Sequence, residues 1–312
     1  MTVKDSTSKP TAEPIKIGLM SDLHLEFEAE HREWVLQTIQ LGSSSKAAKA
    51  LAAMRARDNE PGHPENGPDL RALKKATVDL VLLPGDVDIA GRVFGYADAV
   101  AQYLRCPVFG CFGNHDGYDT DLRLSIDAAR RAAANAHGRF VMLERGRADL
   151  LVKGRRLAIF GATLWTDYGL AGDPALAMDW ARTTLNDHVR IRWGDDFFRP
   201  GQALDIHLAT RAWLDKELLG ARDDADVRVV MTHHAPIPEA IRPDRRGDHI
   251  SPAYASDLTQ EIGVWKPNLW VWGHTHHSMD SRVGATRMVS AQRGYVGLEP
   301  GAESFVPAVI EI

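Results

Sequence analysis

The sequence has few cysteines and no long hydrophobic run, and both shortages exclude whole classes of protein. Only 2 of its 312 residues are cysteines, so no disulfide framework holds the chain together. With 44% hydrophobic residues, a chain of this length can bury a core without such cross-links. The longest apolar runs have the length of strands, far short of the ~20 residues of a membrane span. Residues 1–14 are polar and lack the apolar stretch of a secretory signal, so we expect them to be disordered.

The two cysteines, Cys106 and Cys111, flank a short apolar segment. Five positions apart on an extended strand they point to opposite faces, and their separation is too large for a local disulfide. We therefore expect two buried, reduced thiols, as is typical of a cytoplasmic protein. The spacing could also form half of a metal site, but the sequence has no second cysteine pair to complete it.

Positive charge is scarce as well, whereas histidine is plentiful. The 37 Lys and Arg residues are outnumbered by 42 Asp and Glu, which gives a formal net charge of −5. This balance argues against an extended surface for nucleic acid or for anionic membranes. The chain contains 13 histidines, and their positions carry most of the functional information.

Short apolar segments alternate with helical patterns along most of the chain. Segments rich in Val, Ile, Leu and aromatic residues predict strands at 15–20, 78–84, 106–112, 156–163, 227–232 and 268–272. Helical patterns lie at 119–136, 174–191 and 205–220, with Asp119 and Asp173 as expected N-caps and Gly220 just past a C-terminus. The alternation predicts an α/β fold with largely buried sheets. Short strands after residue 278 predict an antiparallel meander.

Residues 26–76 interrupt this alternation. The segment contains two helical patterns, within 31–57, and a loop rich in Pro, Gly and Asn. We interpret it as a helical and loop insertion over one edge of a domain that spans 15–312. The helical part could cover an active site, form a dimer contact or simply be solvated.

Residues that bind metal ions follow five of the predicted strands. These residues are Asp22 and His24, Asp86, Asn114 and His115, His233 and His234, and finally His274 and His276. In α/β sheets, sites form beyond the carboxyl ends of the strands, so these side chains are expected to converge. Alternate residues in Asp-x-His and His-x-His point to one side, and the glycines before Asp86, Asn114 and His274 allow sharp turns. Carboxylate, amide and imidazole ligands suit Mn, Fe, Zn or Ni.

The ordered series D-x-H, G-D, G-N-H-D, H-H and G-H-x-H resembles the calcineurin-like metallophosphoesterases. The segments TLWTDY, LNDHVRIRW, HISPAYASDL and AQRGY resemble one bacterial, single-domain branch of that family, so the resemblance covers nearly the whole chain. The chain departs from that branch where AQRGY replaces N-P-R-G-Y, and in the long interval between Asp22 and Asp86. The resemblance implies a four-layer αββα sandwich of two mixed sheets flanked by helices, with a dinuclear metal site at the C-terminal ends of the strands.

The resemblance also implies a role for each residue of the motifs. One divalent metal ion would be held by Asp22, His24, Asp86 and His276. The second would be held by Asp86, Asn114, His233 and His274, so that Asp86 bridges the two. Mn²⁺ is the expected ion, with Fe, Zn and Ni as alternatives. A hydroxide between the metals would attack phosphorus in line, His115 would assist the leaving group, and Asp116 would orient His115.

Several other residues are candidates for substrate contact. His234 could touch substrate or support His233, and Asp88 is expected to be a turn or supporting carboxylate rather than a ligand. Trp165, Tyr168 and His249 could line the pocket or simply pack. Four arginine side chains are candidates to hold phosphate oxygens, although a solvated charge on a helix surface is the expected role of any single one: Arg182, Arg190, Arg192 and Arg199.

These observations predict a cytoplasmic phosphoester hydrolase with a small phosphoester substrate, no membrane contact and no extended nucleic-acid surface. No second clamp for phosphate oxygens is visible in the sequence, which favours small phosphodiesters. A phosphomonoesterase, a nuclease, a hydrolase acting on another group and a non-catalytic metal-binding scaffold stay open as alternatives.

Overall fold

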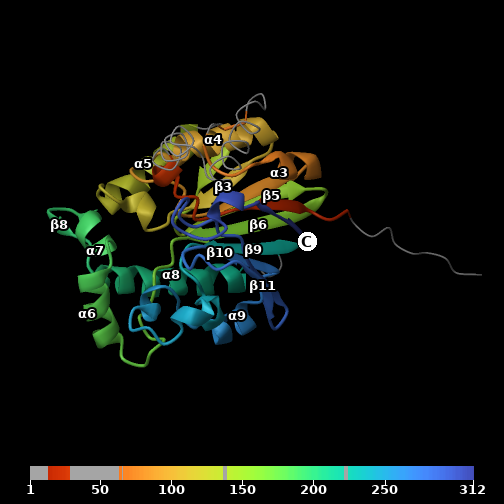
Figure 1. Cartoon of the computed structure of the whole chain (residues 1–312). Coiled ribbons are helices and arrows are strands. Elements are labelled where there is room, and N and C mark those ends of the chain that lie inside the picture. Colours follow the sequence, from red (N-terminus) through yellow and green to blue (C-terminus); the bar gives the residue numbers. More distant parts are fainter. Residues whose placement is uncertain (1–12, 29–62, 65, 136–138, 221–223) are drawn as a thin grey trace, which may run out of the picture.

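The computed structural model describes residues 13–28, 63–64, 66–135, 139–220 and 224–312 (Figure 1). Most of the segment expected to be disordered, most of the predicted insertion, and His31 and His137 lie outside the described residues. The described part of the insertion includes helix α3 (Arg71–Ala76), which packs against the rest of the domain through the buried side chains of Leu70 and Leu73.

Two mixed sheets form the middle of the molecule (Figure 1). The first sheet has the order β13-β1-β2-β3-β4, in which β13 is antiparallel to β1 and the other neighbours are parallel. Its strands are β1 (Lys16–Leu19), β2 (Leu80–Pro84), β3 (Val108–Cys111), β4 (Phe140–Met142) and β13 (Ala308–Glu311).

The second sheet has the order β11-β12-β10-β9-β6-β5. Its four inner strands are parallel, while β5 and β11 run antiparallel to their neighbours at the two edges. The strands are β5 (Gly146–Val152), β6 (Arg155–Ala162), β9 (Val227–Thr232), β10 (Leu269–Trp272), β11 (Met279–Val283) and β12 (Thr286–Ser290).

The two sheets pack face to face because their strands are apolar on both sides. In β2, Leu80 and Leu82 join the cluster between the sheets, whereas Val81 and Leu83 join the cluster under the helices. Successive side chains of a strand point to opposite faces, so a continuous apolar run is buried in both directions. Ile159 of β6 meets the same inter-sheet cluster from the second sheet.

Helices cover the outer face of each sheet (Figure 1). On the first sheet lie α3, α4 (Val93–Leu104) and α5 (Leu122–Asn135), and on the second lie α8 (Pro200–Gly220) and α9 (Thr259–Trp265). The helix–sheet–sheet–helix order confirms the predicted four-layer sandwich. The remaining elements are α6 (Pro174–Thr184), α7 (Asp187–Arg190), a hairpin of β7 (Arg192–Trp193) and β8 (Asp196–Phe197), and 3-10 turns at Leu25–Phe27, His115–Gly117, Pro238–Ala240, Pro243–Arg245, Ser251–Ala253 and Ala302–Ser304.

All six predicted strands are present, but some helix boundaries were wrong. Asp173 caps α6 as expected, because its side chain accepts a hydrogen bond from the backbone N–H of Leu176 at 3.1 Å. Asp119 does not cap α5, since its carboxylate pairs with Arg190 and the helix begins three residues later. The helix expected at 174–191 is broken between α6 and α7, where Leu185 adopts extended backbone. Gly220 is the last residue of α8 and does not follow it.

The C-terminal region differs from the expected meander. Strands β11 and β12 pair antiparallel as predicted, but β12 then joins β10 in parallel and β13 crosses to the first sheet. Cys111 is buried and Cys106 is half-buried, and both thiols are free. None of the helices in the described ranges has the length and apolar character that crossing a bilayer requires.

We predict that Leu82→Ala lowers the free energy of unfolding by about 2–5 kcal/mol, because the Leu82 side chain is fully buried between the sheets. The matched control is Leu151→Ala in β5, whose side chain is 74% exposed and whose loss should change stability by less than about 0.5 kcal/mol. Urea denaturation of both variants measures the difference. Equal destabilisation would contradict the assignment of Leu82 to the inter-sheet core.

Candidate functional site

The carboxyl ends of five parallel strands meet at one edge of the sandwich. Strands β1, β2 and β3 of the first sheet and β9 and β10 of the second each continue into a loop that carries predicted ligands. The structure brings all of these side chains into one buried cluster, and none is more than 8% exposed except His276, which is half-buried: Asp22, His24, Asp86, Asn114, His233, His274 and His276.

The cluster contains two groups of side chains that could each hold a metal ion. Asp22, His24 and His276 form the first group. In it, His276 Nε2 lies 3.0 Å from His24 Nε2 and 3.7 Å from Asp22 Oδ1. This composition agrees with the ligands expected for the first metal.

The second group consists of Asp86, His233 and His274, with Asn114 beside them. His233 Nε2 lies 3.1 Å from His274 Nδ1, 3.0 Å from Asn114 Oδ1 and 3.4 Å from Asp86 Oδ1. These are the four residues expected around the second metal.

The carboxylate of Asp86 lies between the two groups. Its Oδ1 faces His233 of the second group, and its Oδ2 lies 3.7 Å from His24 Nε2 of the first. One oxygen is thus directed at each group, which is the arrangement of a carboxylate that bridges two cations.

Hydrogen-bond partners indicate which imidazole nitrogens carry protons in the first group. Nδ1 of His24 lies 3.2 Å from Glu26, and Nδ1 of His276 lies 2.9 Å from Glu299. An ionised carboxylate only accepts, so each Nδ1 donates, and in the neutral imidazole each Nε2 then presents a lone pair. Two lone pairs that face each other at 3.0 Å repel unless a proton or a cation lies between them. The set of inward-facing ligand atoms therefore fits a metal ion.

The second group shows the same convergence of acceptors. Nδ1 of His233 donates to the backbone carbonyl of Pro84 at 2.9 Å, which leaves Nε2 as an acceptor. The amide nitrogen of Asn114 donates to Asp187 Oδ1 at 2.8 Å, which turns Asn114 Oδ1 toward His233. A cation satisfies several such acceptors at once, and outer partners of this kind hold metal ligands in their binding orientation.

Burial governs the charge of these groups. It lowers the pKa values of His24, His233 and His274, so that their imidazoles are neutral, the form that binds metals. Burial also raises the pKa of Asp22 to about 6 and, with the nearby Asp22 carboxylate, raises that of Asp86 well above its usual range. Cation binding at these carboxylates is therefore coupled to the release of protons.

Several ligand residues have strained backbones. A positive φ is uncommon outside glycine and costs about 1–3 kcal/mol per residue, so a group of such residues points to a functional constraint. The φ values lie between 47° and 72° at five of the seven predicted ligands: Asp22, His24, Asp86, His274 and His276.

Two of the three glycines that precede the ligands serve a different purpose from the one expected. Of the three, Gly85 alone has a positive φ, at 80°. A Cβ at Gly113 would overlap Oδ1 of Asp86, and one at Gly273 would lie 2.7 Å from Asp22 Oδ2. At these two positions glycine is required because a ligand carboxylate packs directly against the backbone.

His115 lies next to both groups and is held on several sides. Its Nδ1 is 2.8 Å from Glu26 Oε1, its Nε2 is 3.3 Å from the Tyr295 hydroxyl, and its ring stacks on Tyr118 at 4.2 Å. Its backbone N–H donates to Asp86 Oδ1 at 2.9 Å, which fixes the ring beside the bridging carboxylate. Burial acts to raise the pKa of Glu26, but hydrogen bonds from His115 and His24 lower it to about 2, so Glu26 is ionised.

The expectation that Asp116 orients His115 was wrong. Asp116 Oδ2 accepts hydrogen bonds from the backbone N–H groups of Asp86 at 2.9 Å and Gly113 at 2.8 Å, and so joins the β2 and β3 loops. His115 and Asp116 are consecutive residues of a 3-10 turn, in which neighbouring side chains diverge by about a third of a turn. Glu26 occupies the orienting position instead.

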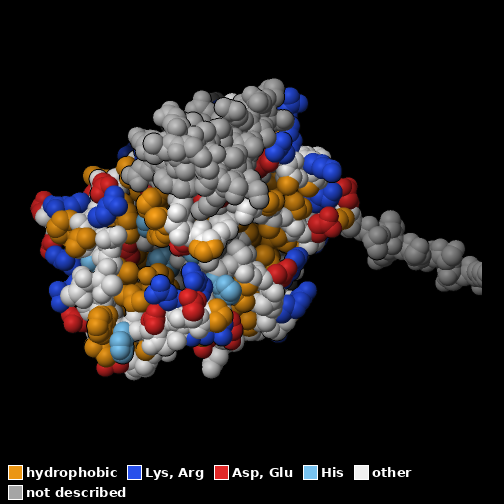
Figure 2. All heavy atoms as spheres, in the orientation of Figure 1, with side chains coloured by type: hydrophobic (Ala, Val, Ile, Leu, Met, Phe, Trp, Pro, Cys, Tyr) orange, Lys and Arg blue, Asp and Glu red, His pale blue; other side chains and the backbone are white. Residues whose placement is uncertain are grey.

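A cavity of about 390 Å³ opens over the metal-binding groups. Its floor is formed by Asp86, Asn114, His115, His274 and His276, and its walls by tyrosines and charged residues: Tyr118, Tyr254, Tyr295, Asp187, Asp248, Glu299, Arg242 and Arg245. In Figure 2, His side chains lie within a hollow below the grey atoms, beside Lys or Arg and Asp or Glu side chains. A larger cavity of about 570 Å³ shares Ile241, Asp248 and Ser251 with it, but no predicted ligand lines that second cavity.

Most of the predicted substrate contacts lie elsewhere. Trp165 and Tyr168 are buried in an aromatic cluster, and His249 stacks on Trp180 with ring centroids 5.4 Å apart. Of these three candidates, none belongs to the described residues that line the ligand cavity. The ring of His234 packs 4.1 Å from that of His274 and its Nδ1 lies 3.3 Å from the carbonyl of Thr163, which places it behind the ligands.

The arginines at the cavity are not those suggested by the sequence. Arg182, Arg190 and Arg199 pair with Asp179, Asp119 and Asp196, and Arg192 packs over Phe197. Arg242 and Arg245 line the cavity and were not predicted.

Comparison with known proteins agrees with this geometry. The model of the calcineurin-like phosphoesterase family matches residues 15–278. A phosphopantetheinyl hydrolase from Mycobacterium tuberculosis is similar in structure, with a TM-score of 0.60 at 15% identity over 97% of each chain. A dimetal phosphatase from Danio rerio aligns with a TM-score of 0.48 at 12% identity over 92% of this chain and 90% of that one. No curated protein matches the chain. The chain belongs to the calcineurin-like phosphoesterase family and is a phosphoric ester hydrolase.

Proposed function

We propose that the protein hydrolyses small phosphoesters with two divalent cations held by the clustered Asp, Asn and His side chains. The observation that supports this most strongly is the position of Asp86, whose two oxygens face two separate groups of converging acceptors. Bound there, two cations would polarise the phosphoryl oxygens and activate a water molecule for attack on phosphorus.

The side chains of this protein would position the cations and handle the leaving group. Asp22, His24 and His276 would hold one cation, Asn114, His233 and His274 the other, and Asp86 both. Nδ1–H of His115 donates to Glu26, which directs Nε2 toward the cavity and the Tyr295 hydroxyl. A proton held at Nε2 is then available to the departing oxygen, a contribution of general acid catalysis.

The cavity suggests the size of the substrate. Cavities of a few hundred Å³ accommodate small molecules, and the volume here is about 390 Å³. The lack of a second clamp for phosphate oxygens in the sequence favours phosphodiesters. Arg242 and Arg245 line the cavity and can form such a clamp, so this reason for a diester no longer holds. A comparison of p-nitrophenyl phosphate, its bis-ester and a phosphopantetheine ester under Mn²⁺, Fe²⁺, Zn²⁺ and Ni²⁺ separates the substrate classes. We propose Mn²⁺ as the working ion, because a mixed set of oxygen and imidazole ligands suits it.

We also propose that the protein acts in the cytoplasm. The support is the pair of free thiols at Cys106 and Cys111, since oxidising compartments favour disulfides.

We predict that Asp86→Ala reduces the metal content from two ions per chain to at most one and abolishes hydrolysis, because both groups lose a ligand. Metal content by plasma mass spectrometry and turnover of p-nitrophenyl esters measure the effect. Asp88→Asn is the matched control, because Asp88 pairs with Arg92 and belongs to neither group. Two tightly bound ions in Asp86→Ala would contradict the bridging role, and no metal in the wild type would favour a non-catalytic scaffold.

We predict that His115→Asn retains both metal ions but lowers kcat about 10²–10⁴-fold on esters with alkyl leaving groups. The loss should be smaller for p-nitrophenyl esters, since a good leaving group needs little protonation. His277→Asn provides the control and should keep wild-type turnover, because His277 is half-buried, directly follows His276 and is not one of the predicted ligands. Full activity of His115→Asn on an alkyl ester would disprove the acid role.

We predict that Glu26→Gln lowers metal affinity or turnover about 10–100-fold, because the carboxylate orients both His24 and His115. A metal titration measures the loss of metal affinity, which acts through the ligand His24. Kinetics at saturating metal measure the loss of turnover, which acts through His115. If activity and metal affinity both stay at the wild-type level, Glu26 has no positioning role.

A further inference from the structure

Two arginines line the wall of the ligand cavity. Among the described residues that line this cavity, Arg242 and Arg245 are the only Lys or Arg. We propose that they form a subsite for a second anionic group of the substrate, a phosphate or a carboxylate, while the reacting phosphoryl group occupies the metal end. This inference rests on the proposed function and specifies its substrate class.

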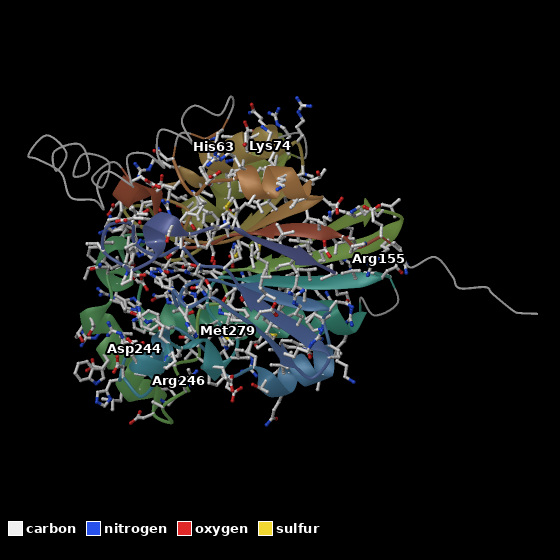
Figure 3. All side chains as sticks on the ribbon, turned by 45° about the vertical axis from the view of Figure 1, so that its right-hand side comes forward. His63, Lys74, Arg155, Asp244, Arg246 and Met279 are labelled. Atoms are coloured by element: carbon white, nitrogen blue, oxygen red, sulfur yellow. The ribbon has the colours of Figure 1, made fainter. Side chains whose placement is uncertain are left out.

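The backbone that carries the two arginines is held in place. Arg246 folds back onto its own loop, where its guanidinium donates to the carbonyls of Ile241 and Glu239, each at 3.1 Å. The Ser251 hydroxyl donates to the carbonyl of Arg245 at 2.7 Å. Figure 3 shows Arg246 and the neighbouring Asp244 at the outer edge of the molecule, away from the sheets. These contacts hold the loop in a fixed position as the part of the cavity wall that carries Arg242 and Arg245.

Both guanidinium groups retain free donors. Nε and Nη2 of Arg242 bind the two oxygens of Asp244 at 3.1 and 2.8 Å, so Nη1 has no partner in the described part of the chain. Arg245 makes a long contact of 3.5 Å from Nη1 to Asp248, and its side chain is 65% exposed. A guanidinium has five N–H donors in a planar fork that matches carboxylate and phosphate oxygens. Exposed ion pairs contribute little, so an arriving anion competes with these aspartates at small cost.

The distribution of charge separates the two ends of the cavity. The floor carries the carboxylate of Asp86 and would receive cations, whereas the wall carries the permanent positive charges of Arg242 and Arg245 beside the carboxylates of Asp187, Asp248 and Glu299. A phosphoester with one negative group occupies the floor alone. A substrate with a second anionic group on its alcohol portion contacts both the metal end and the two arginines. It therefore binds more tightly than the same ester with an uncharged alcohol portion.

The test compares two non-hydrolysable probes on the metal-loaded protein by isothermal titration calorimetry. Propylphosphonate carries one anionic group, and propane-1,3-bisphosphonate carries a second at the other end of the same chain. We expect the bisphosphonate to bind at least tenfold more tightly to the wild type. In Arg242→Gln/Arg245→Gln the preference should fall to about threefold or less, and in each single variant it should be intermediate.

Arg182→Gln is the matched control, because Arg182 is an exposed arginine paired with Asp179 outside the cavity, and it should keep the wild-type preference. Circular dichroism and metal content verify that the double variant is folded and loaded. A wild type without preference for the bisphosphonate, or a folded double variant that retains it, overturns the subsite. Failure of the proposed function is a separate result: no hydrolysis of any p-nitrophenyl ester with any of the metals, whatever the binding data show.

Discussion

The site depends on one physical constraint, the convergence of many hydrogen-bond acceptors from separate loops on two points. His24, His233 and His276 each donate from Nδ1 to an outer partner and so direct a lone pair inward. Asp86 adds one oxygen to each of the two groups that result. Such an arrangement is unfavourable by itself, and the gain from binding cations offsets it. The outer partners are therefore as much a part of the site as the ligands.

The scaffold tolerates this arrangement because the strands behind it are buried on both faces. The ligand loops contain the strained residues, while the strands that precede them lie in three apolar clusters. Gly113 and Gly273 let carboxylates lie against the backbone of a neighbouring loop, so the loops from different strands interlock. The buried strands thus offset the strain of the ligand loops and fix their positions, as is usual where functional loops lie on a rigid scaffold.

The sequence identifies which side chains converge at the site, but few of the residues around them. Asp22 and His24 follow an apolar strand, and their place in the ordered motif series identified them, although their backbone is left-handed and not the extended form that the alternation assumed. Glu26 continues the same alternation and could have been found by that signal. Glu299 and Arg242 are brought to the site only by tertiary packing, and no local pattern marks them. For the same reason β13 was expected in a meander, since its short apolar sequence fits either sheet.

Segments from the two ends of the described chain meet beside the site, where β13 pairs with β1 and the loop after β1 contacts the segment around Gln292. Ser21, two residues after β1, bridges to Gln292, and the backbone N–H of Gly294 donates to the carbonyl of Asp22 at 3.0 Å. The loop that holds the first ligands is therefore completed by a segment synthesised about 270 residues later. Contacts of such long range slow folding, because the entropy of closing the intervening chain must be overcome first. A chain still in synthesis also lacks His274 and His276, so it cannot yet carry the complete centre.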